Sequence, residues 1–256
     1  MDLGLEKRRA LVTGASRGLG RAITLALAAE GADVVAVARN QERLGELAAE
    51  SAGSGKITAR SCDLADASAI EALSDVLGRV DVLVINTGGP APGPAAETSD
   101  AVWSKQFEAM FLSAVRITRL ALPGMRKRGF GRIIAVVSSG VIQPIPNLGV
   151  SNALRSALVG WAKTLAGEVA SQGITVNCLA PGRIATDRVA ELDQGRAKHE
   201  AIGVEEVERQ SRMAIPAGRY GDAAEFASVA AFLASARASY TTGGIIRVDG
   251  GMIRSS

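Results

Sequence analysis

Apolar and polar positions along the chain follow two alternating patterns: short apolar runs, and longer segments whose apolar residues recur at helical spacing. The short runs predict buried β-strands, and the longer segments predict helices between them. This alternation predicts an α/β fold with a doubly wound, mostly parallel sheet, right-handed crossovers and helices on both faces. The seven predicted strands cover residues 9–13, 33–38, 56–61, 81–85, 132–137, 174–179 and 244–248.

The chain shows no sign of a domain boundary. No internal repeat, low-complexity tract or Pro/Ser-rich linker interrupts the alternation, and 256 residues suit one α/β domain better than two. The composition, 47% hydrophobic and 4% aromatic, fits buried parallel strands covered by helices. We therefore expect residues 1–256 to form a single domain.

A glycine-rich stretch follows the first predicted strand and leads into a helical pattern. It reads Thr13-Gly14-Ala15-Ser16-Arg17-Gly18-Leu19-Gly20. Glycine permits a tight turn and close ligand approach, and the N-terminus of the next helix presents unpaired N–H groups and a partial positive charge. The order of strand, glycine turn and helix predicts the phosphate cradle of a dinucleotide site, although such a string also occurs as a plain turn between packed elements.

The end of the second predicted strand bears on the choice of dinucleotide. An acidic residue about twenty positions after the glycines would bind the ribose 2′-hydroxyl of NAD(H). Ala38, Arg39 and Asn40 stand there instead. Arg39, together with Arg17 in the glycine turn, suits a 2′-phosphate, because guanidinium groups pair well with phosphate oxygens. We predict NADP(H) over NAD(H); the alternative is that Arg39 only begins a solvated helix.

Two further strand ends carry polar residues suited to the same ligand. Asp63 follows the third strand, where it either accepts a hydrogen bond from the adenine amino group or caps the next helix. For Asp66 we expect the helix cap. Asn86-Thr87-Gly88-Gly89 follows the fourth strand, where short side chains let the backbone approach a ribose, as they also do in an ordinary turn.

These motifs together resemble those of the short-chain dehydrogenase/reductase family. T-G-A-S-R-G-L-G, C-D-L, N-T-G-G, P-G-R-I-A-T-D and V-D-G-G-M occur in that family's order over essentially the whole chain, and the C-terminal part is similar to 3-oxoacyl-acyl-carrier-protein reductases. The resemblance implies a Rossmann-type fold, a homodimer or homotetramer, and a Thr186 that holds the nicotinamide carboxamide. The residues that it places around the dinucleotide are Gly14, Ser16, Arg17, Gly18, Leu19, Asp63, Leu64, Asn86, Gly88, Pro181, Gly182, Ile184 and Thr186.

The same resemblance reveals an altered catalytic set. Family members use a Tyr and a Lys four residues later for proton transfer, a Ser that polarises the carbonyl, and an Asn that supports a proton-relaying water. The Ser is present as Ser139, whereas Ser151, Arg155 and Met110 stand at the Tyr, Lys and Asn positions. Three of the four catalytic residues are therefore replaced.

The replacements change the proton chemistry. Arg155 keeps a positive charge but does not release a proton near neutral pH, and the Ser151 hydroxyl is far less acidic than a phenol. Tyr220 and Tyr240 lack a Lys at the required spacing, and Lys163 lies two helical turns beyond Arg155. Losing a matched general acid costs roughly 10²- to 10⁴-fold in rate. Another donor, such as a water or the substrate itself, would then have to supply the proton.

Several roles stay open for these residues. Arg155 either anchors the ribose hydroxyls of the nicotinamide half, which we favour, or binds a carboxylate or oxyanion together with Ser139, Ser151 and Asn152. Ser151 is alternatively the N-cap of its helix. Asn152 is a candidate donor to the substrate oxygen.

The segment 187–212 is rich in charged residues and follows the nicotinamide-contacting segment. The family has a mobile lid over the substrate at this place, so we predict a lid here. Its His199 is the only histidine; an imidazole suits proton exchange, but on so polar a segment we expect it to be solvated. Helical patterns at 103–122 and 151–170 carry apolar residues on more than one face, which suits packing against a second subunit.

Charge and cysteine content bear on partners and location. The net charge of +3 is small and dispersed, so we expect no nucleic-acid partner, and Arg126-Lys127-Arg128 is more simply the basic last turn of a helix. Cys62 and Cys178 have no CxxC or metal-ligand spacing, so we expect packed, reduced thiols, no metal site and a cytoplasmic protein. The N-terminus is not a signal peptide and no apolar run is long enough to cross a bilayer, so we expect no membrane partner.

The sequence thus predicts an NADP(H)-dependent oxidoreductase that interconverts a carbonyl and an alcohol on a small-molecule or acyl-thioester substrate, with a non-standard proton donor. Ser139, Ser151 and Arg155 are the candidate catalytic residues. Two alternatives stay open. One is an NADP(H)-binding protein without turnover, acting as a sensor, scaffold or partner subunit; the other is a non-redox lyase or isomerase.

Overall fold

The computed structural model describes residues 2–50 and 55–255, and its seven strands form one sheet. The strand order is β3-β2-β1-β4-β5-β6-β7, and all six pairings are parallel. The doubly wound sheet predicted from the sequence is confirmed, with strand ends displaced by one or two residues. The strands are β1 (Arg9–Thr13), β2 (Asp33–Ala38), β3 (Ile57–Ser61), β4 (Val82–Ile85), β5 (Gly131–Val136), β6 (Ile174–Pro181) and β7 (Ile245–Val248).

The central strands are apolar because both faces of the sheet are covered. Along β4, Val82 and Val84 belong to the hydrophobic cluster on one face, and Leu83 and Ile85 belong to the cluster on the other. Successive side chains of a strand point to opposite faces, so an unbroken apolar run supplies both cores at once. All four residues of β4 are buried.

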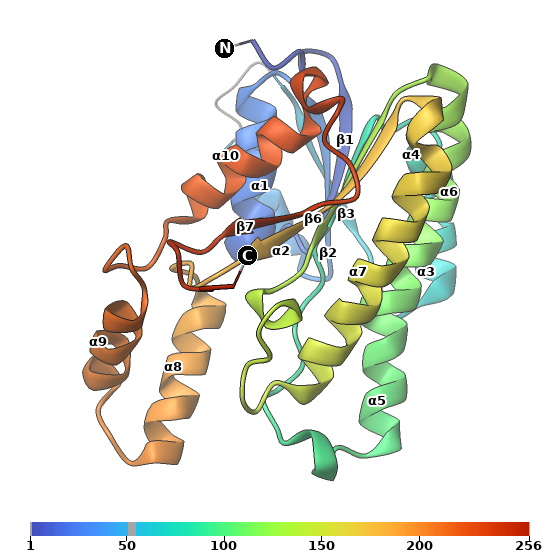
Figure 1. The fold of residues 1–256 in the computed structure, drawn as a ribbon. Coiled ribbons are helices and arrows are strands. Elements are labelled where there is room, and N and C mark those ends of the chain that lie inside the picture. The colour runs from blue at the N-terminus through green and yellow to red at the C-terminus, as the bar shows by residue number, and fades with distance from the viewer. Residues whose placement is uncertain (1, 51–54, 256) are drawn as a thin grey trace.

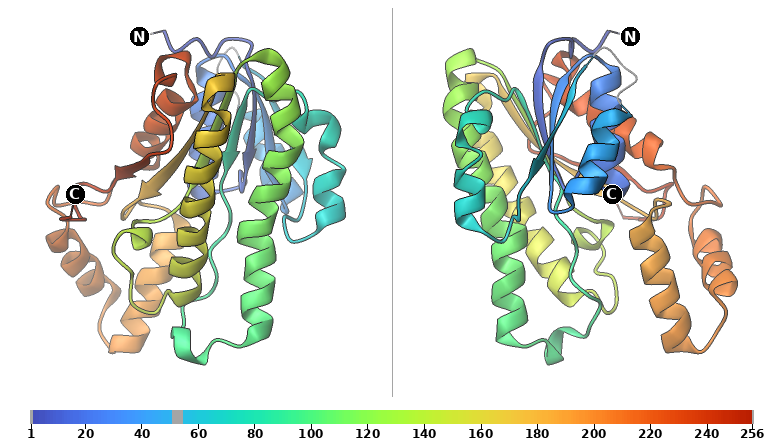
Figure 2. Two further views of the ribbon diagram at one scale, coloured as in Figure 1. Left: turned by 45° about the vertical axis from the view of Figure 1, so that its right-hand side comes forward. Right: turned by 180° about the vertical axis from the view of Figure 1, so that it is seen from behind.

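Helices lie on both sides of the sheet (Figures 1 and 2). The first cluster is closed by α1 (Gly18–Ala29), α2 (Gln41–Ala49) and α10 (Ala223–Ala234). The second is closed by α3 (Ala67–Glu71), α4 (Ser74–Leu77), α6 (Ser113–Arg128) and α7 (Gly149–Val169). Amphipathic helices bury their apolar stripes in this way while their polar faces stay in water.

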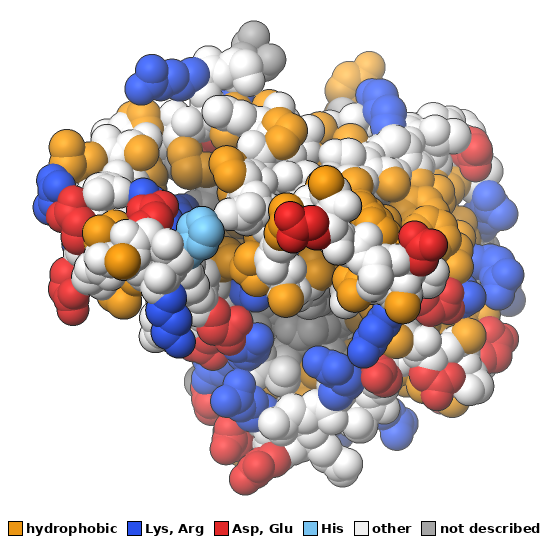
Figure 3. Space-filling view, turned by 90° about the horizontal axis from the view of Figure 1, so that it is seen from below, with side chains coloured by type: hydrophobic (Ala, Val, Ile, Leu, Met, Phe, Trp, Pro, Cys, Tyr) orange, Lys and Arg blue, Asp and Glu red, His pale blue; other side chains and the backbone are white. Residues whose placement is uncertain are grey.

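Three helices extend past the carboxyl ends of the strands, at the lower end of Figure 1. They are α5 (Asp100–Phe107), α8 (Asp187–Glu200) and α9 (Val204–Ala214). The view onto this end shows Lys and Arg side chains mixed with Asp and Glu, and hydrophobic side chains gathered at the right (Figure 3). The strand order reverses between β1 and β4, and ligands of open α/β sheets bind at the carboxyl ends beside such a reversal. A ligand site is therefore expected at this end of the sheet.

Several local predictions are also tested by the structure. The basic run Arg126-Lys127-Arg128 forms the last turn of α6, which ends at Gly129 in the left-handed conformation (φ +62°), as the helix-end interpretation requires. Cys62 and Cys178 are both free and buried. Among the described residues, no helix has the length and hydropathy needed to span a membrane.

Candidate functional site

The glycine stretch forms a compact turn between β1 and α1. Gly14 and Gly18 have φ values of +61° and +54°, in the left-handed region that glycine adopts without strain. A Cβ atom on Gly20 would lie 2.2 Å from the carbonyl oxygen of Gly14, so only glycine fits there. The first helical residue of α1 is Gly18, and its N-cap, Arg17, makes no side-chain capping bond. The N–H groups of this helix end are thus left to bind an anion such as a pyrophosphate.

Hydrogen bonds join the ends of β1 and β4 at this turn. The backbone N–H of Asn86 donates to Thr13 Oγ1 (2.9 Å), and the Thr13 hydroxyl donates to the carbonyl oxygen of Asn86 (3.1 Å). Asn86 Nδ2 donates to the carbonyl oxygen of Gly14 (3.3 Å). Two of the predicted dinucleotide contacts, Gly14 and Asn86, therefore lie side by side at the point where the strand order reverses.

The turn after β6 completes this group from the other side. Thr186 is the N-cap of α8, where its hydroxyl accepts from the N–H of Val189 (3.4 Å). Its Cγ2 lies 3.6 Å from the place where a Cβ on Gly18 would be, so the β6–α8 turn lies against the glycine turn. Gly182 also has no room for a side chain, because a Cβ would lie 2.7 Å from the backbone of Asp249. The two turns therefore bring Gly14, Gly18, Asn86 and Thr186 together at the strand ends, in the arrangement that a dinucleotide site requires.

The two arginines proposed to favour NADP(H) occupy exposed positions. Arg39 follows β2, and α2 begins only at Gln41, with Asn40 as its N-cap. Arg39 is thus a solvated residue just before that helix, and its contact with a 2′-phosphate stays a prediction. The Arg17 guanidinium pairs with Glu191 of α8 (2.7 Å) and lies 3.9 Å from Asp187.

The acidic residues after β3 have different roles. Asp66 caps α3 by accepting from the backbone N–H groups of Ser68 and Ala69, as predicted. Asp63 instead accepts from the N–H of Ala65 (3.0 Å) within the turn, so the prediction that Asp63 caps the helix is wrong. Its proposed contact with adenine stays a prediction. The neighbouring Leu64 packs on the second hydrophobic cluster.

Ser139, Ser151 and Arg155 are buried at the carboxyl ends of β4 and β5, with exposed fractions of 3%, 8% and 8%. The Arg155 guanidinium donates from Nη1 to the carbonyl oxygen of Val136 (2.8 Å) and from Nη2 to that of Thr87 (3.3 Å). Its Nε donates to Ser151 Oγ (3.3 Å). Arg155 thus bridges the ends of two strands while its side chain lies at the base of the site.

Burial shifts the pKa of Arg155 downward. Loss of solvent, and then the nearby positive charge of Arg188, lower its pKa from 12.5 to about 10. The group still carries its charge at pH 7, in agreement with the expectation that it does not release a proton there.

Comparisons with known proteins support the same interpretation. A family model described as enoyl-(acyl carrier protein) reductase matches residues 14–253. The chain is 37% identical over 255 residues to the 3-oxoacyl-[acyl-carrier-protein] reductase FabG of Vibrio cholerae, covering 98% of this chain and 99% of that protein. It belongs to the short-chain dehydrogenase/reductase family.

Two further relatives are named as NADPH-linked. The chain is 33% identical over 258 residues to the NADPH-dependent reductase BacG of Bacillus subtilis, covering 98% of this chain and 100% of that protein. The solved structure of L-sorbose reductase from Gluconobacter frateurii, complexed with NADPH and L-sorbose, matches with a TM-score of 0.93 at 32% identity, over 100% of each chain. This short-chain dehydrogenase/reductase is thus related along its whole length to oxidoreductases that act on carbonyl or alcohol groups.

The family's Asn position has become part of an apolar cluster. Met110 lies in a π-helical turn (Glu108–Leu112) between α5 and α6, an irregularity often found at functional sites. It is 3% exposed and packs with Val150 and Leu154 of α7. A thioether in this cluster offers no hydrogen bond strong enough to hold a proton-relaying water.

Other polar side chains do not replace the missing tyrosine. Tyr240 is fully exposed, and the Tyr220 hydroxyl donates to Asp193 Oδ2 (2.8 Å). Lys163 lines a separate cavity of about 370 Å³ between α7 and the strands β6 and β7. His199 is exposed in the last turn of α8, as expected.

The structure bears on two assignments near the start of α7. The helix begins at Gly149 with Leu148 as its N-cap, so Ser151 is not a cap. Asn152 donates from Nδ2 to the carbonyl oxygen of Ile145 (2.9 Å) and accepts from the Ile145 N–H at Oδ1 (3.4 Å). These two bonds hold the loop before α7, and the donation from the second Nδ2 hydrogen to the substrate oxygen stays a prediction.

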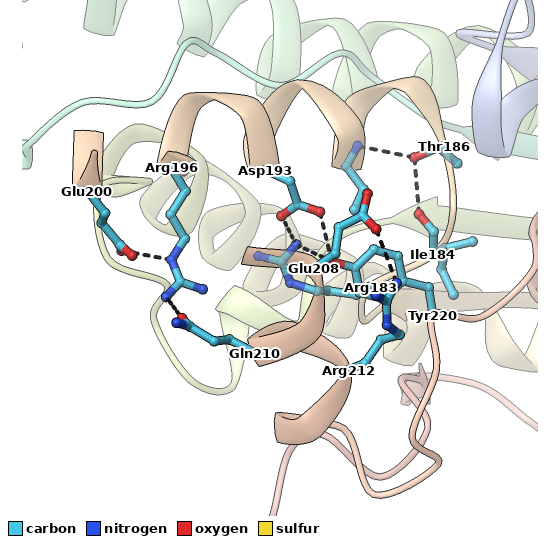
Figure 4. Close-up of polar contacts among 11 residues, drawn as sticks. Arg183, Ile184, Thr186, Asp193, Arg196, Glu200, Glu208, Gln210, Arg212 and Tyr220 are labelled. Atoms are coloured by element: carbon cyan, nitrogen blue, oxygen red, sulfur yellow. Dashed lines mark hydrogen bonds and ion pairs between the residues drawn. The ribbon is translucent and has the colours of Figure 1, made fainter. Parts of the chain in front are cut away.

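The segment predicted as a lid is a pair of helices, α8 and α9, with its own polar core (Figure 4). Asp193 is 1% exposed and accepts hydrogen bonds from Arg183 and from the Tyr220 hydroxyl. Around it, Arg196 bridges Glu200 and Gln210. The Arg196–Gln210 bond joins the two helices, whereas Asp193 ties α8 to Arg183 before it and to Tyr220 after α9.

One residue with a place at the site was missed in the sequence. Arg188, two positions after Thr186 in the first turn of α8, donates from Nη2 to the carbonyl oxygen of Pro90 (2.7 Å). Its position directly after the segment implied to hold the nicotinamide was a usable signal. In the sequence alone, however, this position does not separate Arg188 from the other charged residues of the segment 187–212.

Proposed function

We propose that this protein binds NADP(H) and interconverts a carbonyl and an alcohol at the carboxyl ends of β4 and β5. The observation that supports this is the placement of the glycine turn and the β6–α8 turn beside a buried Ser139, Ser151 and Arg155. Arg17 and Arg39 favour the 2′-phosphorylated cofactor, because no acidic residue stands where NAD(H) would need one.

The chain's own residues then have defined tasks. NADP(H) supplies or accepts the hydride. The Ser139 hydroxyl donates a hydrogen bond to the carbonyl oxygen, and the buried charge of Arg155 stabilises negative charge that develops on this oxygen. Because Arg155 stays protonated at pH 7, the proton that completes the alcohol comes from solvent or from the substrate.

Substrate and assembly belong to the same proposal. FabG relatives make 3-oxoacyl thioesters the first substrates to test. We propose that α8 and α9 cover the substrate as a lid, and that the protein is a cytoplasmic homodimer or homotetramer. Support for the oligomer comes from α5, where the apolar side chains of Val102 and Phe107 are 42% and 40% exposed.

A cofactor titration and a turnover screen test the proposal together. NADPH oxidation is followed at steady state with ketones, aldehydes and 3-oxoacyl thioesters, beside fluorescence titrations with NADPH and NADH. Turnover with at least one carbonyl class, and tighter binding of NADPH than of NADH, are expected. Arg17→Ala and Arg39→Ala should each narrow the NADPH/NADH preference by roughly tenfold, the loss of one charge-assisted contact.

One observation favours a second candidate, a cofactor-binding protein without turnover. Met110 fills the position of the family's relay residue with an apolar side chain, and its neighbours Val150 and Leu154 are apolar too. Tight NADPH binding without oxidation by any carbonyl in the screen would establish this second candidate and refute the first.

A further inference from the structure

Two arginines from different helices donate to the same short loop after β4. Arg155 of α7 donates to the carbonyl oxygen of Thr87, and Arg188 of α8 donates to that of Pro90, three residues further on. Arg188 Nη2 also lies 3.4 Å from the place where a Cβ on Gly89 would be. Both guanidinium groups therefore lie along the segment 87–90, at the end of the sheet where the proposed reaction occurs.

Carboxylates near these arginines are too few to neutralise them. The Glu191 carboxylate lies 3.6 Å from the Arg188 guanidinium but only 2.7 Å from that of Arg17. The Asp187 carboxylate lies 3.9 Å from the Arg17 guanidinium. Arg17 and Arg188 thus share Glu191, Asp187 lies near Arg17 alone, and neither carboxylate pairs with Arg155. Within the described chain, Arg155 forms no ion pair at all; its partners are two backbone carbonyls and one hydroxyl.

Arg155 is the most buried of these arginines, so its positive charge is the one that a bound anion would stabilise most. Arg155 is buried, and a buried charge without a counter-ion is unfavourable unless a ligand supplies one. Ser139, 3% exposed, makes no hydrogen bond from its hydroxyl to any described side chain or backbone group, and its 3₁₀ turn packs on the start of α7. Buried hydroxyls and a buried guanidinium with no carboxylate between them form a site for an oxyanion.

We propose that the substrate carries a carboxylate near its reacting carbonyl, and that Arg155 and Arg188 bind this carboxylate. The planar fork of a guanidinium matches the two oxygens of a carboxylate, which a neutral ester or amide cannot reproduce. This inference rests on the proposed carbonyl chemistry, because it assigns the anion to the substrate of that reaction. The carbonyl carbon accepts a hydride from NADPH and its oxygen accepts a proton from solvent, so an oxo acid becomes a hydroxy acid as NADPH becomes NADP⁺.

Matched substrate pairs test the proposal. Steady-state NADPH oxidation is measured with 2-oxo and 3-oxo acids and with their methyl esters. We expect kcat/KM for the best acid to exceed that for its ester by at least about tenfold, the value of one charge-assisted hydrogen bond. Arg188→Leu should remove most of this preference. Arg209→Leu is the matched control, because Arg209 is exposed and pairs with Glu206 within a single helix, α9. Equal rates for acids and esters, or a preference that survives Arg188→Leu, would overturn the inference.

A binding measurement separates this inference from the proposed function. Oxamate, a carboxylate beside a carbonyl that is not reduced, is titrated into the protein–NADPH complex and followed by nicotinamide fluorescence. Binding that Arg188→Leu abolishes and Arg209→Leu retains supports the anion site, even if no carbonyl compound is turned over and the proposed function fails. Reduction of neutral carbonyls without oxamate binding leaves the function standing and refutes the anion site. If Arg188→Leu instead loses affinity for NADPH, this arginine binds the cofactor, and the proposed anion site is likewise refuted.

Discussion

Replacing Asp193 by alanine tests whether α8 and α9 form a unit with its own stability. The carboxylate is 1% exposed and accepts hydrogen bonds from Arg183 and from the Tyr220 hydroxyl. Removing it leaves a partly buried phenol without its acceptor and a guanidinium without its counter-ion. Breaking a buried ion pair costs about 3–5 kcal/mol, and the partial exposure of Arg183 (27%) favours the lower end of this range.

The loss should be local. Because Asp193 joins α8 to the segments that flank the helix pair, and Figure 1 shows both helices beyond the strands, a loss of about 3 kcal/mol should raise local opening of this pair by roughly 10²-fold. Hydrogen exchange read by mass spectrometry should show faster exchange in 187–214, with unchanged rates in β1, β4 and β5.

Glu208→Ala is the matched control. Its carboxylate pairs with Arg212 one turn away on α9, and both side chains are about 40% exposed. Such a pair contributes about 0.3–0.5 kcal/mol, so exchange should hardly change. If Asp193→Ala behaves like this control, the buried network does not hold the helices together. If it accelerates exchange throughout the sheet, the helix pair is not a separate unit.

Three further outcomes are expected. Gly20→Ala should weaken NADPH binding at least about tenfold in a fluorescence titration, since its Cβ would strike the Gly14 carbonyl, whereas Gly45→Ala meets no atom within 4 Å and should bind normally. Ser151→Tyr combined with Arg155→Lys should raise kcat/KM for ketone reduction by roughly 10²–10⁴-fold; no gain with intact NADPH binding would contradict the placement of these residues beside the reacting carbonyl. Burial raises the pKa of Cys178 to about 12. Above pH 9 the unfolded thiol therefore loses its proton while the native thiol keeps it, and the native state is destabilised by about 1.4 kcal/mol at pH 10. Urea titrations should show this fall in wild type beyond that in Cys178→Ala, and parallel curves would argue against it.

The fold was predictable because its signals are local and repeated. An unbroken apolar run supplies buried side chains to both faces of the sheet, so it marks a strand clearly. The start of β4 could therefore be predicted within one residue. The glycine turn was predictable for the same reason: Gly14, Gly18 and Gly20 are required by the backbone itself, through positive φ or through contacts closer than a Cβ allows.

The partners of polar side chains were less predictable, because residues distant in sequence determine them. The Asn152 amide has a natural place near a substrate, but it bonds to Ile145 seven residues earlier. Arg188 could not be linked to the site until the fold brought α8 beside the loop after β4, 98 residues away in the chain. The π-helical turn at Met110 had no signal either, since its sequence continues an ordinary helical pattern.

The bridge that Arg155 forms between Thr87 and Val136 has a consequence for any attempt to redesign this protein. The Arg155 side chain supplies the positive charge of the site, and it also links the loops that follow β4 and β5. A lysine has a single nitrogen with which to satisfy carbonyls that two nitrogens of the arginine now serve, and a neutral residue would satisfy neither. Specificity and architecture are therefore coupled here, so any substitution of Arg155 alters the charge of the site and the support of both loops at once.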